Sequence, residues 1–350
     1  MREDSHRLPA FLLRAVSFER GRLRILDQTL LPHRFMYLHP KSANEVAAII
    51  KRLAVRGAPA IGVAAAYGLA VEAKRLPDSL LSQGLEQAAR TLIAARPTAV
   101  NLRWAVLRVM QSVSVRGLSV SAIRSAAATE ARAIETEEIA RSIAMARFGA
   151  ALLPKRAEVL TICNTGALAA PGMGTALGVV FQAHLDGKTP NVYACETRPL
   201  LQGSRLTTLE LLRAKIPVTL IVDSAAASVM DKCDIVLAGA DRIAANGDTA
   251  NKVGTRMLAT LARAARKPFY IVAPTSTFDS ATPNGGKIVV EERDGEEVRA
   301  FAGCRAAPKC VPVFNPAFDV TPARLITGFV TDRGILKLPH RRSILQLLNR

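Results

Sequence analysis

The sequence is poor in aromatic side chains, which make up 5% of its residues, with one Trp and four Tyr. Modules that bind single-stranded nucleic acid stack bases on aromatic side chains and concentrate positive charge beside them. Here the formal net charge is +18, but the basic residues are spread along the chain, with one short cluster at residues 340–342. We therefore expect no nucleic-acid partner and attribute the charge to solvated surface and an anionic small substrate.

Cysteine is also scarce, with five residues at scattered spacing, an odd number that does not suit a disulfide framework. The closest pair, Cys304 and Cys310, has no second Cys or His cluster at zinc-finger spacing, so we expect no metal site. The longest apolar run, residues 58–71, is shorter than the roughly 20 residues that span a bilayer. Residues 1–10 lack the apolar core of a secretory signal. These absences favour a cytoplasmic protein without membrane contact.

Two different patterns of apolar residues along the chain predict two domains. Apolar residues recur at helical spacing from about residue 44 to residue 149, with Asn44 as the expected N-cap of the first helix and Pro59 at the start of an Ala-rich one. Residues 15–31 have the alternation and central Gly of a small antiparallel strand pair. We therefore predict an N-terminal domain of short antiparallel strands and helices over residues 1–150, and a second domain over residues 151–350.

The second domain alternates short β-branched runs with helical stretches. This alternation predicts an α/β fold in which a parallel sheet has helices on both faces. The strands are expected at 158–163, 191–194, 217–222, 234–238 and 268–273, and the helices at 174–185, 206–214, 225–230 and 253–265. Ligands of such sheets bind beyond the carboxyl ends of the strands, so we expect the functional residues there.

Polar residues next to small ones follow nearly every predicted strand. Cys163 precedes a Gly-containing turn that leads toward a helix, whose first amides would lower the pKa of the thiol; an inert buried thiol is the alternative. Asp241 ends an apolar run, where desolvation would raise the pKa of its carboxyl and allow general acid catalysis near neutral pH. The alternative for Asp241 is an ion pair with Arg242, and the alternative for Asp223, after the third strand, is a helix cap.

Several cationic residues are candidates for binding phosphate. Arg56 precedes Gly57, which permits close backbone approach, and Arg96 and Lys252 offer further charge, although each could equally be solvated surface. Two nucleotide-binding motifs fail on inspection. Residues 172–178 have one residue too many for a dinucleotide fingerprint, and residues 182–189 have Gln where a P-loop begins with Gly. Nucleotide binding is therefore not predicted.

Six segments carry a resemblance to a known family. They read RGAPAIG (56–62), RPTAVN (96–101), CNTGALA (163–169), ETRPLLQGSRLT (196–207), GADRIAANGDTANKVGT (239–255) and NPAFDVTP (315–322). In content and order they resemble the S-methyl-5-thioribose-1-phosphate isomerase family. Its superfamily also includes ribose-1,5-bisphosphate isomerases and non-catalytic regulatory subunits of a translation-initiation exchange factor. The resemblance extends from about residue 18 to residue 336, which is almost the whole chain.

The resemblance implies a small N-terminal strand-and-helix domain followed by a Rossmann-like domain, usually as a homodimer. The implied reaction belongs to methionine salvage and converts 5-methylthioribose 1-phosphate to 5-methylthioribulose 1-phosphate without a metal or nucleotide cofactor. The catalytic Cys and Asp of the family fall on Cys163 and Asp241. Its substrate-binding positions fall on Arg56, Gly57, Ala58, Arg96, Gln202, Asn251 and Lys252.

The implied chemistry accounts for the pair of catalytic residues. A phosphate on the anomeric oxygen prevents spontaneous ring opening, so an acid must protonate the ring oxygen before hydrogen moves from C2 to C1. Asp241 is the expected acid. Cys163 would act as base on C2 or help to hold a cationic opened intermediate, and both proton transfer through an enediolate and a direct hydride shift stay open.

Two alternatives and three departures accompany this hypothesis. The protein could isomerise a sugar with another 5-substituent, such as ribose 1,5-bisphosphate or 5-deoxyribose 1-phosphate, or be a non-catalytic translation-factor subunit, which has no need of the pair. Ile162 stands where the family commonly has His, Met173 where it has Tyr, and Cys195 precedes the ETRP segment where another residue is usual. These departures concern the surroundings of Cys163 or substrate preference and leave the pair intact.

Overall fold

A computed structural model describes residues 8–97, 99–115, 117–301, 303–337 and 340–348. The chain divides into two compact units. Unit 1 comprises Met1–Ile143 and Gly166–Gly174, and unit 2 comprises Ala144–Thr165 and Thr175–Arg350. None of the described helices is long and apolar enough to cross a membrane.

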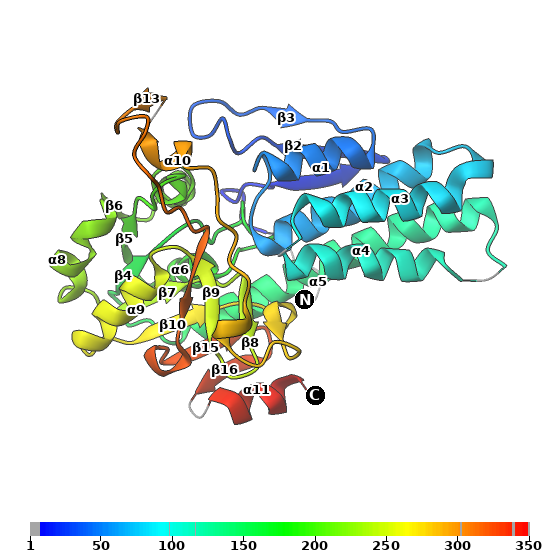
Figure 1. The fold of residues 1–350 in the computed structure, drawn as a ribbon. Coiled ribbons are helices and arrows are strands. Elements are labelled where there is room, and N and C mark those ends of the chain that lie inside the picture. The colour runs from blue at the N-terminus through cyan, green and yellow to red at the C-terminus, as the bar shows by residue number, and fades with distance from the viewer. Residues whose placement is uncertain (1–7, 98, 116, 302, 338–339, 349–350) are drawn as a thin grey trace. The chain divides into compact units, whose positions relative to one another are not determined.

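Unit 1 begins with a three-stranded antiparallel sheet formed by β1 (Val16–Glu19), β2 (Arg22–Leu26) and β3 (Tyr37–Leu38). Arg20 and Gly21 join β1 to β2, and both have positive φ angles, of 49° and 73°, as the tight turn of a twisted hairpin requires. The predicted antiparallel strand pair is therefore confirmed (Figure 1).

The other main elements of unit 1 are helices. They are α1 (Ala43–Lys51), α2 (Ala58–Arg75), α3 (Leu81–Ala95), α4 (Val100–Val113) and the start of α5 (Val120–Ala150). Helix α2 is buried along nearly its whole length and packs against α1, α3 and α4 (Figure 1). Its Ala-rich sequence suits this central place, because small side chains let neighbouring helices approach from several sides. Pro59 lies in the first turn of α2, as predicted.

The predicted N-cap of the first helix is wrong. Asn44 lies inside α1, whereas Ser42 is the N-cap and its side chain accepts a hydrogen bond from the backbone N–H of Glu45. Ser42 and Glu45 have the Ser-x-x-Glu spacing of a capping box, since the Glu45 carboxylate in turn accepts from the N–H of Lys41 and from the Ser42 hydroxyl. The reciprocal bonds make Ser42 the better cap.

Unit 2 is built around a seven-stranded sheet in the order β16-β15-β10-β7-β4-β5-β6, parallel except for β16. The strands are β4 (Glu158–Thr161), β5 (Asn191–Cys195), β6 (Val218–Ile221), β7 (Ile235–Ala238), β10 (Phe269–Val272), β15 (Gly328–Thr331) and β16 (Gly334–Lys337). The predicted parallel sheet is confirmed.

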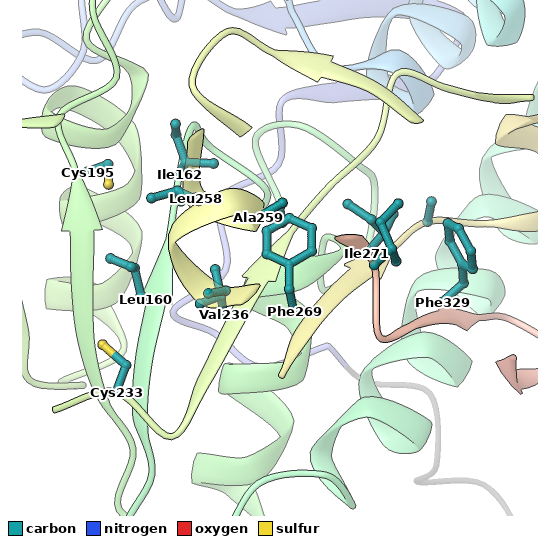
Figure 2. Packing of buried hydrophobic residues seen from close by; sticks show 14 of the residues in the cluster. Leu160, Ile162, Cys195, Cys233, Val236, Leu258, Ala259, Phe269, Ile271 and Phe329 are labelled. Carbon is teal, nitrogen blue, oxygen red and sulfur yellow. The ribbon is translucent and has the colours of Figure 1, made fainter. Parts of the chain in front are cut away.

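The helices of unit 2 alternate with these strands in sequence, and the last of them follows β16. They are α6 (Ala176–Leu185), α7 (Thr208–Arg213), α8 (Ala226–Met230), α9 (Thr255–Ala264), α10 (Glu296–Arg299) and α11 (His340–Leu348). Alternate strand residues such as Leu160, Val236 and Phe269 pack with residues of α8, α9 and α11 in one core (Figure 2). The residues between them, such as Val159 and Leu237, are also fully buried, so both sheet faces are covered.

A second, four-stranded sheet was not predicted. It has the order β11-β8-β9-β14, with β8 (Arg242–Ala244), β9 (Thr249–Lys252), β11 (Phe278–Asp279) and β14 (Phe318–Thr321). A separate short hairpin pairs β12 (Ala300–Phe301) with β13 (Cys304–Arg305). These strands are too short and too polar to show an alternating apolar pattern, which is why the sequence does not reveal them.

The capping box predicts a difference between two neighbouring substitutions. Ser42→Ala should lower the free energy of unfolding by about 1 kcal/mol, because it removes the acceptor at the start of α1. Asn44→Ala, at an exposed position inside the helix, should change it by less than about 0.5 kcal/mol. Chemical denaturation of both variants measures the difference, and equal effects would contradict the assignment of Ser42 as the cap.

Candidate active site

The strand order of unit 2 reverses direction between β4 and β7. Chain order runs outward from β4 to β5 and β6 on one side, and from β7 to β10 and β15 on the other. The two central strands are in register, with Thr161 opposite Leu237, and the Thr161 hydroxyl donates to the Leu237 carbonyl at 2.8 Å. At such a switch point the loops leaving the two strands diverge and open a binding crevice.

Cys163 lies in the loop that leaves β4, with its side chain half-buried. Its φ angle is 66°, in the left-handed region that non-glycine residues seldom adopt. Its N–H donates to Thr197 Oγ1 at 2.8 Å, and its carbonyl accepts from Thr207 Oγ1 at 2.6 Å. A turn follows Cys163 and the next helix, α6, begins at Ala176, close to the predicted start at residue 174.

The loop that leaves β5 supports the Cys163 loop. Thr197 also has a left-handed backbone, with a φ angle of 67°, and it is fully buried. The carboxylate of Asp223 accepts from the N–H of Thr197 at 2.8 Å and from the N–H of Arg198 at 2.7 Å. Asp223 therefore ties two neighbouring strand ends together rather than capping a helix with its side chain.

Gln202 begins a π-helical turn, Gly203–Thr207, that leads into α7. A Cβ at Gly203 would lie 1.7 Å from the carbonyl oxygen of Cys195, so only glycine permits this approach to the end of β5. The side chain of Gln202 is buried, and its Oε1 has no hydrogen-bond partner among the described residues. A buried acceptor without a protein partner is costly, and a bound ligand would satisfy it.

Asp241 lies in the loop that leaves β7, and its side chain is half-buried. The loop contacts the Cys163 loop, because a Cβ at Gly239 would lie 3.1 Å from the side chain of Thr165. The N–H of Asp241 donates to the Ala250 carbonyl at 3.0 Å, which fixes it against β9. The neighbouring Arg242 forms an ion pair with Asp279 at 3.6 Å. The structure thus brings Cys163 and Asp241 to adjoining loops.

Strand β9 carries Asn251 and Lys252, and both side chains are largely buried. Asn251 donates to Thr255 Oγ1 at 2.9 Å. The Lys252 ammonium donates to the Ala317 carbonyl at 2.8 Å and stands 5.1 Å from the centre of the Phe318 ring. A largely buried ammonium group is a natural site for an anion, because burial strengthens its attraction for negative charge.

Asp319 on β14 pairs across the sheet with Asn251 and has no counterpart among the predicted site residues. Its carboxylate accepts from the N–H of Gly254 at 2.7 Å and from that of Arg256 at 3.0 Å, at the start of α9. Burial raises the pKa of Asp319 to about 6, although these amides and the nearby Arg256 and Lys252 act in the opposite direction. Asp319 therefore holds the turn that follows Asn251 and Lys252.

The remaining predicted substrate-binding residues belong to unit 1. Arg56 and Gly57 precede α2, which begins at Ala58, and Gly57 has a φ angle of 93°. A Cβ at Gly57 would lie 2.2 Å from the carbonyl oxygen of Ala169, so the glycine is required by packing as well as by its backbone angle. Arg96 is the half-buried C-cap residue of α3.

The three departures from the family pattern are all buried. Ile162 and Cys195 belong to the core beneath the sheet ends of unit 2 (Figure 2), and Met173 is buried in unit 1. Burial, together with the charge of Asp223, raises the pKa of the Cys195 thiol to about 12, so this cysteine stays uncharged. A Cβ at Gly254 would lie 2.7 Å from Ile162 Cδ1, so Ile162 packs against the start of α9.

Sequence reasoning singled out the residues on the strand ends, Asp223 among them, but missed Thr207 and Asp319. The supporting roles of all three depend on contacts between segments far apart in sequence. No local motif identifies such contacts. Within the described residues, no group of three or more His, Cys, Asp or Glu side chains is placed to hold a metal ion.

Comparison with known sequences covers most of the chain. Residues 54–338 match the Initiation factor 2 subunit family. The chain is 51% identical over 334 residues to the methylthioribose-1-phosphate isomerase of Pelotomaculum thermopropionicum, covering 93% of this chain and 91% of that protein. It is 50% identical over 324 residues to the protein of the same name from Alcanivorax borkumensis, covering 92% and 93%.

Solved structures with different names resemble the chain about equally. The crystal structure of 5-methylthioribose 1-phosphate isomerase from Pyrococcus horikoshii OT3 has a TM-score of 0.90 and 42% identity, covering 97% of this chain and 96% of that one. The structure of translation initiation factor eIF-2B, subunit delta, from A. fulgidus has a TM-score of 0.86 and 41% identity, covering 97% and 100%. Likeness of fold alone therefore does not separate an isomerase from a translation-factor subunit.

The raised pKa of Asp319 predicts a pH dependence of stability. Between about pH 4 and pH 6 the folded state binds more protons at Asp319 than the unfolded state does. The stabilising contribution of Asp319 to the free energy of unfolding is therefore fully present below its unfolded pKa and is lost as the pH rises through 6. Asp319→Asn should remove this loss. Relative to wild type, its free energy of unfolding should rise by up to about 3 kcal/mol from pH 4 to pH 7, measured by denaturation at each pH.

Asp248→Asn is the matched control because its pKa changes in the opposite direction. Burial alone would raise the pKa of Asp248, but hydrogen bonds from Asn246, Ala323 and Gly285 outweigh it and hold the pKa below its usual value. Its stabilisation is therefore present at neutral pH and lost on acidification. Parallel curves for Asp319→Asn and wild type would rule out the proposed titration.

Proposed function

This chain belongs to the initiation factor 2 subunit family, and we propose that within it the chain is an aldose–ketose isomerase. The proposed reaction converts 5-methylthioribose 1-phosphate to 5-methylthioribulose 1-phosphate, a step of methionine salvage. The names of the relatives at 46–51% identity support this reaction. The observation that supports the proposal is that the loops carrying Cys163 and Asp241 adjoin at the switch point of the sheet. The expected homodimer and cytoplasmic location are part of the same proposal.

Asp241 is the proposed acid. It is half-buried and follows a strand whose four residues are all buried. Protonation of the ring oxygen breaks its bond to C1 and leaves a cation there, stabilised by the oxygen that carries the phosphate. General acid catalysis of this kind typically contributes a factor of about 100 to 10,000 to the rate.

Cys163 is the proposed partner on the other side of the reacting carbons. It would remove the C2 proton as a base, or, if hydride moves directly from C2 to C1, stabilise the cation while the C2 hydroxyl loses its proton. In both routes C2 becomes the ketone carbon and C1 gains one hydrogen. The two routes differ in whether the transferred hydrogen exchanges with solvent.

The buried polar groups beside the pair are the proposed substrate ligands of unit 2. Gln202 offers an acceptor that none of the described residues bonds, Asn251 an amide, and Lys252 a largely buried positive charge. Arg56, Gly57, Ala58 and Arg96 are assigned to substrate binding from the family resemblance. The first amides of α2 and the Arg56 guanidinium have the character of a phosphate site, because helix N-termini and arginine both favour anions.

A translation-factor subunit is the second candidate function, favoured by the 41% identity to the A. fulgidus structure of that name. A scaffold that only binds other proteins has no need of a thiol and a carboxyl on adjoining loops. The two candidates therefore differ in whether the purified chain turns over a phosphosugar.

Purified protein should convert 5-methylthioribose 1-phosphate to the ketose and should convert ribose 1,5-bisphosphate much more slowly. Product formation is followed by NMR, and the same reaction in D2O shows whether deuterium enters C1. Incorporation indicates proton transfer through an enediolate, and its absence indicates a hydride shift. No turnover of the first substrate would remove the proposed function, and faster turnover of the bisphosphate would reassign the substrate.

Substitution of either member of the pair should abolish turnover. Cys163→Ser and Asp241→Asn keep the size of the side chain but remove the thiol or the acidic proton, so kcat should fall by at least about a thousandfold while the protein still folds and binds substrate. Steady-state kinetics and calorimetric binding measure the two effects. Near-normal kcat in either variant would refute the role given to that residue.

Arg96→Ala is the contrasting variant, because its proposed role is binding alone. It should raise KM by about ten- to a hundredfold, as expected for the loss of a hydrogen bond to a charged group. It should change kcat little. A fall in kcat as large as that of Cys163→Ser would contradict this division of roles.

A further inference from the structure

The backbone of Cys163 is strained in a way that the proposed reaction does not by itself explain. A left-handed conformation is unfavourable for a residue with a Cβ, and it persists only where the surroundings impose it. The direction of the Cα–Cβ bond, and with it the position of the thiol, depends on this conformation. The groups that impose it therefore decide where the sulfur lies.

Two threonine hydroxyls hold the two polar backbone groups of Cys163. Thr197 Oγ1 accepts from the N–H at 2.8 Å, and Thr207 Oγ1 donates to the carbonyl at 2.6 Å. Both threonines are fully buried, so water cannot replace either hydroxyl. They come from different segments, the loop after β5 and the end of the π-helical turn.

The proton of each hydroxyl has a defined direction. Thr197 Oγ1 donates its proton to the Cys195 carbonyl at 3.0 Å, which leaves its lone pairs for the N–H of Cys163. Thr207 Oγ1 gives its proton to Cys163 and accepts from Asn164 Nδ2 at 3.4 Å. The Asp223 carboxylate in turn accepts from the N–H of Thr197 and so fixes the backbone of Thr197. The network is consistent from end to end.

We infer that Thr197 and Thr207 are positioning residues that hold Cys163 in its left-handed conformation and so aim its thiol at the substrate. The role of the thiol in this inference rests on the proposed function. The clamp, by which we mean the two threonine hydroxyls bonded to the Cys163 backbone, does not. Without either hydroxyl, the backbone of Cys163 relaxes toward an ordinary conformation and the sulfur moves. A displacement of about 1 Å at a reacting group is enough to cost on the order of a hundredfold in rate.

Paired substitutions separate the hydroxyl from the bulk of the side chain. Thr197→Val and Thr207→Val remove the hydroxyl at constant shape, whereas Thr197→Ser and Thr207→Ser retain it. Thr161→Val is the matched control, since Thr161 is also buried and lies two residues before Cys163, but its hydroxyl donates to the Leu237 carbonyl. Asp223→Asn weakens the anchor of Thr197 and serves as a second variant should a valine variant fail to fold.

Two readouts are needed. The first is the rate of alkylation of Cys163 by iodoacetamide across a pH series, quantified by mass spectrometry with the exposed Cys304 as internal reference. The second is the split between kcat and KM. Because alkylation needs no substrate, it tests the clamp even if 5-methylthioribose 1-phosphate proves not to be turned over, a result that would count against the proposed function alone.

The valine variants should change the alkylation rate of Cys163 by about threefold or more and lower kcat by about tenfold or more, with KM within about twofold of wild type. The serine variants should have the alkylation rate and kcat of wild type, and Thr161→Val should alter neither quantity. Asp223→Asn should change the alkylation rate in the same direction as Thr197→Val. The inference is overturned if the valine variants alkylate like wild type, if serine does not rescue, or if Thr161→Val has the same effect.

Discussion

The parallel pairing of β4 with β7 is the constraint on which the rest of the site depends. It sets Thr161 beside Leu237 and so brings the loops that carry Cys163 and Asp241 into contact. The two loops adjoin, although Cys163 and Asp241 are 78 positions apart in the sequence, because two buried strands share a ladder of hydrogen bonds. The reversal of strand order at this pair also keeps the space above it clear of a crossover connection.

The site is held by backbone contacts more than by side-chain ion pairs. Cys163, Thr197 and Leu201 all have left-handed backbones, and each is expensive unless packing and hydrogen bonds enforce it. The core beneath supplies rigidity through Ile162 and Cys195, both fully buried. Close packing at Gly203 against the end of β5 removes the remaining freedom of the supporting turn. A rigid core beneath strained loops suits a reaction that depends on the exact positions of the reacting groups.

The large positive net charge of the chain does not indicate where the candidate site lies. Many arginines are engaged with carboxylates on their own helices or on neighbouring ones. Arg108 of α4 contacts Glu130 and Glu137 of α5, and Arg293 pairs with Glu297. Because such pairs occur throughout the chain, net charge does not locate a phosphate site. Burial distinguishes Lys252, which is largely enclosed, whereas most of the described basic side chains are at least partly accessible.

The sequence by itself determined the central sheet, the helices and the family, because apolar periodicity and dense motifs are local properties of the chain. It also predicted Cys163 and Asp241 as candidate catalytic residues, since ligands of parallel sheets bind where the strands end. Only the tertiary structure decided that Ser42 rather than Asn44 caps α1, that β8, β9 and β14 form a second sheet, and that Thr197 and Thr207 grip Cys163. These features depend on partners distant in sequence, whose hydrogen bonds exist only once the chain has folded.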